Sequence, residues 1–519
     1  MPPAQKTRRK GGRFLNRNIP RIARLAAAAL AVLALAAAFV LRFSYSTSFL
    51  YPGYCGFDSA IFQTIGKYWA EEVTPYARLF DHKGPLIFFV DAVGYWLHGR
   101  AGILVVQTVS LAVTVWGLYR LGRTGLSRPW AAGAAALALV YLARTFDEGN
   151  MTEEYSLPFL AVSLYLAVRW CLARKKDPAA PHPWQWAAVY GASFAAILML
   201  RVTSAVAVCS YVLVIALALL AGRQWKNLLA NMGGFLGGFA LLTGPFAVYF
   251  ACKGSLADML YGTIGYNIFY ATEFSIREYY ANSQWAASTL SRVLTDFGAP
   301  LFLLAVLCIA ALVRRKNDLL AWGGLLSGAL SMYVLFTNRP YVHYFMIVTP
   351  LIPLAFVLAA ELVRTGRGKK LALAAPVLCA LWAVSLLIRL PGWSTDSFMA
   401  KYPYETQSYN NAARAAAAVI PKEERDSVLG YNVDAQWYLA ADIQPCQRYF
   451  IHQDWQAAED PSMRSEIDEF LTKDPPKWLV VSGPVEDTVQ QLLDEQYTAV
   501  SGEQQFTDYA SYVLYRRNS

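Results

Sequence analysis

The feature that most constrains this chain is a series of apolar runs of roughly 20 residues between residue 25 and residue 390. A helix needs about 20 apolar residues to cross the hydrocarbon core of a bilayer. Only 16% of the residues are charged, against about 25% in soluble proteins. The pattern therefore predicts an α-helical polytopic membrane protein with about eleven transmembrane helices. The expected spans are 25–41, 101–119, 129–146, 155–173, 185–200, 204–221, 229–251, 298–313, 318–336, 344–363 and 371–390.

The charges between the spans predict how the chain crosses the membrane. Residues 1–24 are basic and contain no acid, which places the N-terminus in the cytoplasm. A cleaved signal peptide is the weaker interpretation of this end, because many more spans follow. If residues 42–100 lie outside the cell, every loop on the inner side is basic, as expected for a membrane protein. The net charge of +10 is therefore explained by the basic inner loops, and no nucleic-acid partner is expected.

An apolar segment at 85–97 needs a separate interpretation. It is too short to span a bilayer and is typical of a helix at the outer interface. If it were a span, the downstream basic loops would lie outside the cell, against the usual charge bias.

The composition changes after residue 393, where charged residues become frequent and long apolar runs end. Short β-rich stretches at 427–431, 478–482 and 511–515 alternate with helical patterns near 404–419, 455–472 and 485–496, which predicts a small extracytoplasmic α/β domain. The protein is expected to lie in the cytoplasmic membrane and to have three parts. They are a basic cytoplasmic tail (1–24), a transmembrane domain (25–393) with outer loops 42–100, 144–155 and 252–297, and the extracytoplasmic domain 394–519. Cys55 and Cys446 both fall on the outer side, so a disulfide between them is left open.

Ionisable residues gather at the predicted outer ends of the spans, and such residues are functional candidates. Asp58 follows the first span and either acts on a substrate or caps the helix that begins there. Lys83 either reaches to lipid headgroups or binds a phosphate. Arg201 and Arg339 flank later spans, and cations on the outer side suit an anion held at the membrane surface.

Neither a phosphate-binding GxxxxGK[ST] loop nor an HExxH metal motif occurs in the sequence. The five histidines are dispersed. A divalent metal bound by Asp81 or His82 together with His343 is left open, and no cofactor is predicted.

Four motifs in this order resemble the GT-C class of glycosyltransferases that use lipid-linked sugars. Within this class, the sequence resembles the protein O-mannosyltransferases and the lipid A aminoarabinose transferases. The motifs are an acid soon after the first span (Asp58), Lys83-Gly84-Pro85-Leu86 before the interfacial helix, Thr152-Glu153-Glu154 in the second outer loop, and Arg339-Pro340-Tyr341-Val342-His343-Tyr344 before a proline-containing span. Lys-Gly-Pro stands where the family has Lys-Pro-Pro, and His82 stands where it has an acid.

The resemblance implies an enzyme that moves a sugar from a polyprenyl-phosphate donor in the membrane to a glycan, lipid or protein hydroxyl. Asp58 would be the general base, and Lys83, Arg201 and Arg339 would bind the donor phosphate. The residues expected to orient the acceptor or the site are Asp81, His82, Glu153, Glu154, Tyr341, His343 and Tyr344. The tyrosine-rich loop 252–297 would cover the site. Two other hypotheses are a flippase of lipid-linked sugars and a non-catalytic envelope assembly protein.

Overall fold

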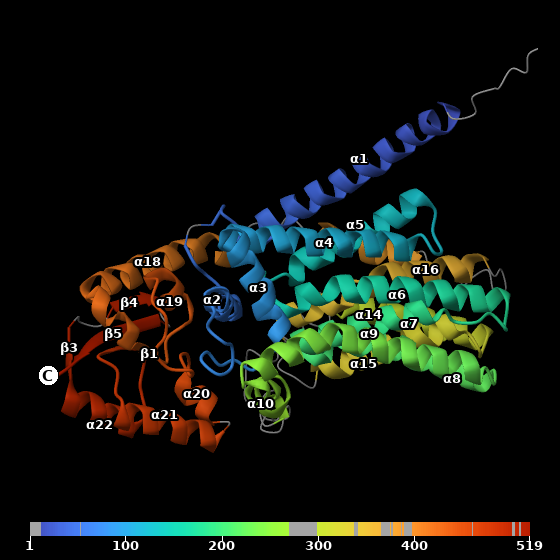
Figure 1. The fold of residues 1–519 in the computed structure, drawn as a ribbon. Helices are drawn as coiled ribbons and strands as arrows, with labels where there is room; N and C mark the ends of the chain where they lie inside the picture. The colour runs from blue at the N-terminus through green and yellow to red at the C-terminus, as the bar shows by residue number, and fades with distance from the viewer. Residues whose placement is uncertain are drawn as a thin grey trace, which may run out of the picture.

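Long apolar helices lie side by side in a bundle, and a small sheet with its own helices lies at one end of that bundle (Figure 1). The computed structural model describes residues 12–51, 53–268, 298–336, 341–364, 374, 377–385, 387–388, 397–458, 460–500, 504–507 and 510–518. The bundle helices are α4 (Arg100–Gly122), α5 (Arg128–Thr145), α6 (Thr152–Lys176), α7 (Trp184–Arg201), α8 (Val206–Ala221), α9 (Trp225–Cys252), α14 (Ala299–Arg314), α15 (Leu319–Phe336) and α16 (Leu351–Arg364). Helix α1 (Gly12–Phe43) packs against α4 through its C-terminal part and projects obliquely from the bundle (Figure 1).

Seven helical segments of the described residues are long and apolar enough to cross a membrane. They are Ile22–Phe43, Arg100–Gly122, Thr152–Lys176, Trp184–Ala221, Trp225–Cys252, Leu319–Phe336 and Val342–Arg364. The protein is therefore a multi-pass α-helical membrane protein. The expected number of eleven stays a prediction, because α5 and α14 are shorter or less apolar, α7 and α8 form one continuous segment, and 371–390 is only partly described.

Two shorter helices connect the bundle to the end that carries the sheet. Helix α2 (Asp58–Ala70) packs against α3 (Pro85–His98), and α3 packs in turn against α4. Pro85 suits the first turn of α3, where an N–H would have no partner inside the helix. Gly99, with a φ of +58°, permits the sharp change of direction between α3 and α4. Helix α3 is 14 residues long, as the short apolar run predicted, and its place at the interface stays a prediction.

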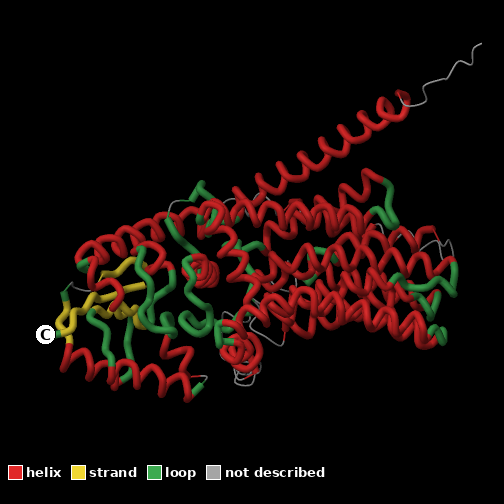
Figure 2. The backbone as a smooth tube through the Cα atoms, in the orientation of Figure 1, coloured by secondary structure: helices red, strands yellow, loops and turns green. Residues whose placement is uncertain are grey.

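The C-terminal part contains a five-stranded sheet in the order β1-β2-β5-β3, with β4 paired to β5. Figure 2 shows the strands confined to this end of the molecule. The strands are β1 (Val428–Tyr431), β2 (Trp478–Val481), β3 (Tyr497–Ala499), β4 (Gln504–Thr507) and β5 (Ala510–Arg517), and only the β1–β2 pair is parallel. Its helices are α18 (Ser397–Val419), α19 (Gln436–Ala441), α20 (Gln453–Ala458), α21 (Pro461–Lys473) and α22 (Asp487–Gln496). The predicted alternation of strands and helices is confirmed, and the boundary at residue 394 stays a prediction.

Hydrogen bonds fasten the C-terminal part to the segments that precede α2 and α3. The side chain of Asn410 accepts from the backbone N–H of Tyr54 at 3.0 Å and donates to its carbonyl at 2.7 Å. The N–H of Phe80 donates to the carbonyl of Arg448 at 2.8 Å. One hydrophobic core joins α2, α3 and the sheet, and a second lies among the bundle helices. Cys55 and Cys446 are both free thiols.

Candidate active site

Charged side chains from several distant segments meet where the bundle joins the C-terminal part. The segments are the start of α2, the loop before α3, the loop between α5 and α6, the first turn of α6, the end of α7, and the short helix η4 (Val342–Val348). The structure thus brings together most of the residues predicted from the sequence.

Asp58 is the first residue of α2 and is half-buried. It does not cap the helix: the N–H groups of Phe57 and Ser59 donate to the carboxylate of Glu148, at 2.6 and 2.8 Å. Across the described part of the chain, the Asp58 carboxylate forms no hydrogen bond or ion pair. A half-buried carboxylate without a protein partner is available to a substrate, which distinguishes Asp58 from its acidic neighbours.

Glu148 itself is buried beneath the start of α2. Gly56 permits this, because its φ of +96° suits glycine and an added Cβ would lie 2.8 Å from a carboxylate oxygen. Burial raises the pKa of Glu148 to about 8, and the nearby carboxylates of Asp147 and Asp58 contribute in the same direction. Glu148 therefore holds its proton more tightly than an exposed glutamate does.

The Glu148→Gln variant tests this protonation through stability. Because the folded protein binds this proton more tightly than the unfolded chain, the wild type should lose stability as the pH rises from about 4.5 to about 8. A tenfold difference in proton affinity corresponds to about 1.4 kcal/mol. We expect the Tm of the variant, relative to that of the wild type, to increase across this range. The exposed Glu423→Gln change serves as the control, and parallel profiles for Glu148→Gln and the wild type would contradict the assignment.

The loop before α3 presents Asp81, His82 and Lys83. The N–H of Lys83 donates to Asp81 Oδ1 at 2.9 Å, and Lys83 Nζ lies 2.9 Å from His82 Nε2. Burial lowers the pKa of His82, and the charges of Lys83 and Arg201 lower it further. His82 is therefore a neutral ring that accepts from the ammonium group. Burial raises the pKa of Asp81 to about 6, although Lys83 acts in the opposite direction.

Gly84 explains why this loop departs from the Lys-Pro-Pro pattern. A Cβ at residue 84 would lie 2.3 Å from the carbonyl oxygen of Met199, so only glycine permits this contact between the loop and the end of α7. Since Arg201 follows two residues after Met199, the contact brings Lys83 and Arg201 to the same side of the site.

A Gly84→Ala substitution should push the loop away from α7. We expect a loss of about 1–3 kcal/mol in the free energy of unfolding, as for other overpacked sites. Gly133→Ala is a matched control, since a Cβ there meets nothing within 4 Å and alanine favours a helix. Thermal unfolding of both variants in detergent measures the difference, and equal Tm values would show that the contact is not tight.

Arg201 is held by a buried carboxylate and an aromatic ring. Its Nη1 lies 2.5 Å from Glu153 Oε1, and its guanidinium carbon lies 3.2 Å from the centre of the Tyr344 ring. Beside it, His343 Nδ1 lies 2.8 Å from Asp147 Oδ2. Arg201 therefore has a fixed orientation before any substrate arrives.

The two adjacent glutamates of α6 have different environments. Glu153 faces Arg201, whereas Glu154 accepts from the side-chain amide of Gln107 at 3.0 Å and from the N–H of Asn150 at 2.8 Å. Asn150 also donates to the buried Asp91 at 3.0 Å. Glu154 thus belongs to a buried polar network behind the site, and the orienting role expected for it stays a prediction.

The structure describes some of the remaining predicted residues and leaves others outside the described ranges. Tyr341 is partly exposed, and its ring lies parallel to that of His343 with centres 5.7 Å apart. Arg339 and most of the loop 252–297, from residue 269 onward, lie outside the described residues. Within the described ranges, no three His, Cys, Asp or Glu side chains are grouped so as to hold a metal ion.

Asp147, Glu148 and Asp91 were not among the predicted site residues. Asp147 and Glu148 belong to an acidic stretch that is visible in the sequence. Their partners are far away along the chain: His343 is 196 residues from Asp147, and Phe57 is 91 residues from Glu148. Asp91 could have been noticed as an acid inside the apolar run 85–97, since such residues are costly to bury.

Comparisons with known proteins identify the fold. No protein-family model matches the sequence, and no curated protein matches it. The structure is similar to that of ArnT from Cupriavidus metallidurans bound to undecaprenyl phosphate, with a TM-score of 0.52 and 15% identity over 95% of this chain and 98% of ArnT. Apo ArnT gives a TM-score of 0.53 and 16% identity, over 94% of this chain and 98% of ArnT. The apo oligosaccharyltransferase of Archaeoglobus fulgidus gives 0.50 and 12%, over 88% of this chain and 69% of that one. The chain therefore has the GT-C fold predicted from its motifs.

Proposed function

We propose that this protein is a membrane glycosyltransferase that moves a sugar from a polyprenyl-phosphate donor to a hydroxyl acceptor on the outer face of the cytoplasmic membrane. The observation that carries the proposal is the half-buried Asp58 carboxylate, which has no partner in the described residues and lies among paired carboxylates near two cations, Lys83 and Arg201. The likeness to an ArnT structure that contains undecaprenyl phosphate supports the class of donor.

In the proposed reaction, an acceptor hydroxyl oxygen forms a bond to the anomeric carbon of the donor sugar. Asp58 takes the hydroxyl proton, a role that accelerates such reactions by about 10²–10⁴-fold. The bond between the anomeric carbon and the phosphate oxygen breaks, and the phosphate leaves with the electron pair. Lys83 and Arg201 are positioned to stabilise the negative charge that develops there.

The neighbouring groups prepare these two cations. Neutral His82 adds no positive charge beside Lys83 and accepts from its ammonium group. Glu153 and the ring of Tyr344 orient Arg201. Because these partners are present before the donor binds, little reorganisation is needed during the reaction.

Lys83→Met tests the phosphate-binding role. Removing one preorganised donor to a developing anion typically lowers kcat by about 10²–10³, and we expect a loss of this size in sugar transfer by purified protein. The exposed Lys253→Met change removes the same charge outside the site and should have no effect. Unchanged transfer by Lys83→Met would remove this residue from the proposed site. Movement of donor across proteoliposomes without any transfer would favour a flippase instead.

A further inference from the structure

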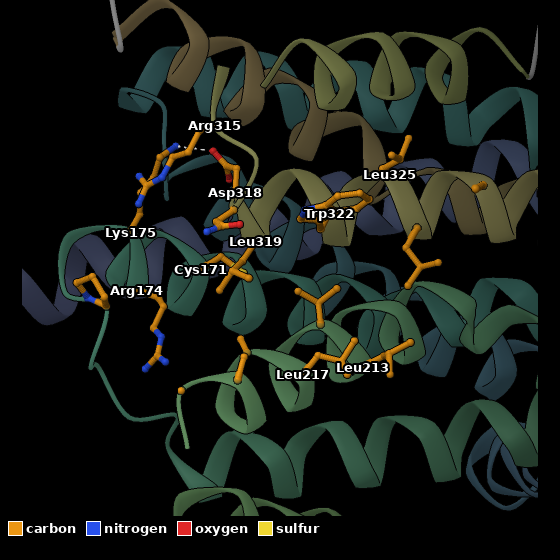
Figure 3. Close-up of a pocket in the computed structure, with 18 residues that line it drawn as sticks. Cys171, Arg174, Lys175, Leu213, Leu217, Arg315, Asp318, Leu319, Trp322 and Leu325 are labelled. Carbon is orange, nitrogen blue, oxygen red and sulfur yellow. Dashed lines mark ion pairs between the residues drawn. The ribbon is translucent and has the colours of Figure 1, made fainter. Parts of the chain in front are cut away.

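A cavity lies at the opposite end of the bundle from the candidate active site. Helix α6 begins at the site with Thr152 and is 25 residues long, so its last residues lie about 36 Å away. The cavity, of about 950 Å³, is bounded there by the end of α6, the end of α8 and the start of α15 (Figure 3).

Cations line one end of this cavity. Arg174 and Lys175 come from α6, and Arg315 comes from the turn before α15. Asp318 is the one carboxylate among the described lining residues, and Lys175 pairs with it at 3.0 Å and with Glu361, just outside the lining, at 3.3 Å. The three lining cations still outnumber these two carboxylates. Arg315 is exposed and forms no ion pair or side-chain hydrogen bond with any described residue. The polar end therefore carries an excess of positive charge and a guanidinium group that is free to bind an anion.

The rest of the cavity is apolar. One face of α8, which includes Leu213 and Leu217, lies opposite one face of α15, which extends from Leu319 to Ala329. Ten residues of helix rise about 15 Å, which is half of the roughly 30 Å hydrocarbon thickness of a bilayer. The walls are thus as long as the acyl region of one leaflet.

The walls are also open to the surroundings of the bundle. Leu213 and Leu217 are 49% and 52% exposed, and Trp322, near the charged end, is 48% exposed. The indole N–H of Trp322 donates to the carbonyl of Lys316 at 2.8 Å, so its polar edge faces the charged end. Tryptophan with one polar and one apolar environment is typical of the membrane interface.

We propose that this cavity binds one anionic phospholipid from the leaflet that surrounds this end of the bundle. The phosphate would lie against Arg315, beside Arg174 and Lys175, and an acyl chain would lie between α8 and α15. A soluble anion would use the charged end alone and would leave the apolar walls without a partner. The inference does not depend on the proposed glycosyl transfer.

Native mass spectrometry of the purified full-length protein, titrated with phosphatidylglycerol or phosphatidylcholine, tests this proposal. We expect the wild type to retain one phosphatidylglycerol in preference to phosphatidylcholine. A hydrogen bond to a charged group contributes about 1.5–3 kcal/mol, so Arg315→Glu should weaken phosphatidylglycerol binding by about tenfold or more.

Two further variants separate this site from a general attraction between charges. Lys316→Glu makes the same change of charge in the adjacent exposed residue, which does not line the cavity, and should leave binding unchanged. Ala329→Trp fills the apolar end and should weaken binding while Arg315 is still present. Four results would each overturn the proposal. Arg315→Glu and Lys316→Glu could weaken phosphatidylglycerol binding equally, or the wild type could retain both lipids equally. Ala329→Trp could leave phosphatidylglycerol binding unchanged, or millimolar inorganic phosphate could displace the bound lipid.

Discussion

Asp58→Asn is expected to lower kcat for sugar transfer by about 10²–10⁴-fold, the usual contribution of a general base. The asparagine keeps the size of the side chain but cannot take a proton from the acceptor hydroxyl. Stability should change little, because Glu148 and not Asp58 caps α2, and the Asp58 carboxylate has no partner among the described residues. Initial rates at saturating donor, together with Tm values in detergent, measure both effects.

A matched control strengthens this prediction. Asp494→Asn makes the same chemical change on α22, where Gln490, which donates to the carboxylate at 2.9 Å, is its one side-chain partner among the described residues. We expect wild-type rates from this variant. Asp58→Asn protein that folds normally and retains full activity would exclude Asp58 as the base. A large fall in its Tm would mean that its carboxylate is structural.

Arg201→Met should have the second large effect, because it leaves the buried Glu153 without its ion-pair partner. Breaking one side of a buried pair typically costs about 3–5 kcal/mol of stability. The change also removes a cation expected to stabilise the departing phosphate, so transfer should fall as well. Tm and transfer rates of the purified protein report the two consequences separately.

The double variant Glu153→Gln/Arg201→Met separates structure from catalysis. Replacing both charges should recover most of the lost stability, since no buried charge is left unpaired. It should not recover transfer, because the phosphate still lacks Arg201. Arg414→Met, on the exposed face of α18, serves as the control for removing an arginine. Recovery of both stability and activity in the double variant would show that Arg201 acts only through Glu153.

The helices of the bundle could be predicted because each depends on a local property of the sequence. Apolar runs of sufficient length specify α4, α6 and α9 without reference to the rest of the chain. The short strands β1 and β2 were also recognisable from local composition. The pairing of β2 with β5, some 30 residues later, depends on register across the sheet and is not apparent from either segment alone.

The candidate site was only partly predictable for the same physical reason. Ionisable residues near the ends of spans identify Asp58, Lys83 and Arg201, because placing a charge there is costly unless it has a role. Their partners are set by tertiary contacts: Glu148 reaches α2 from 89 residues away, and Gly84 contacts the carbonyl of Met199. Without those contacts, the sequence could not separate Glu153, which holds Arg201, from Glu154, which lies in the buried network.

The central claim is that this chain cleaves a lipid-linked sugar donor, and product stoichiometry tests it most directly. Purified protein in detergent would be incubated with labelled polyprenyl-phosphate sugars and hydroxyl acceptors. We predict that the wild type releases one polyprenyl phosphate for each sugar transferred and that Asp58→Asn releases almost none. A wild-type protein that leaves every donor intact but moves it across a proteoliposome bilayer would contradict the proposed function.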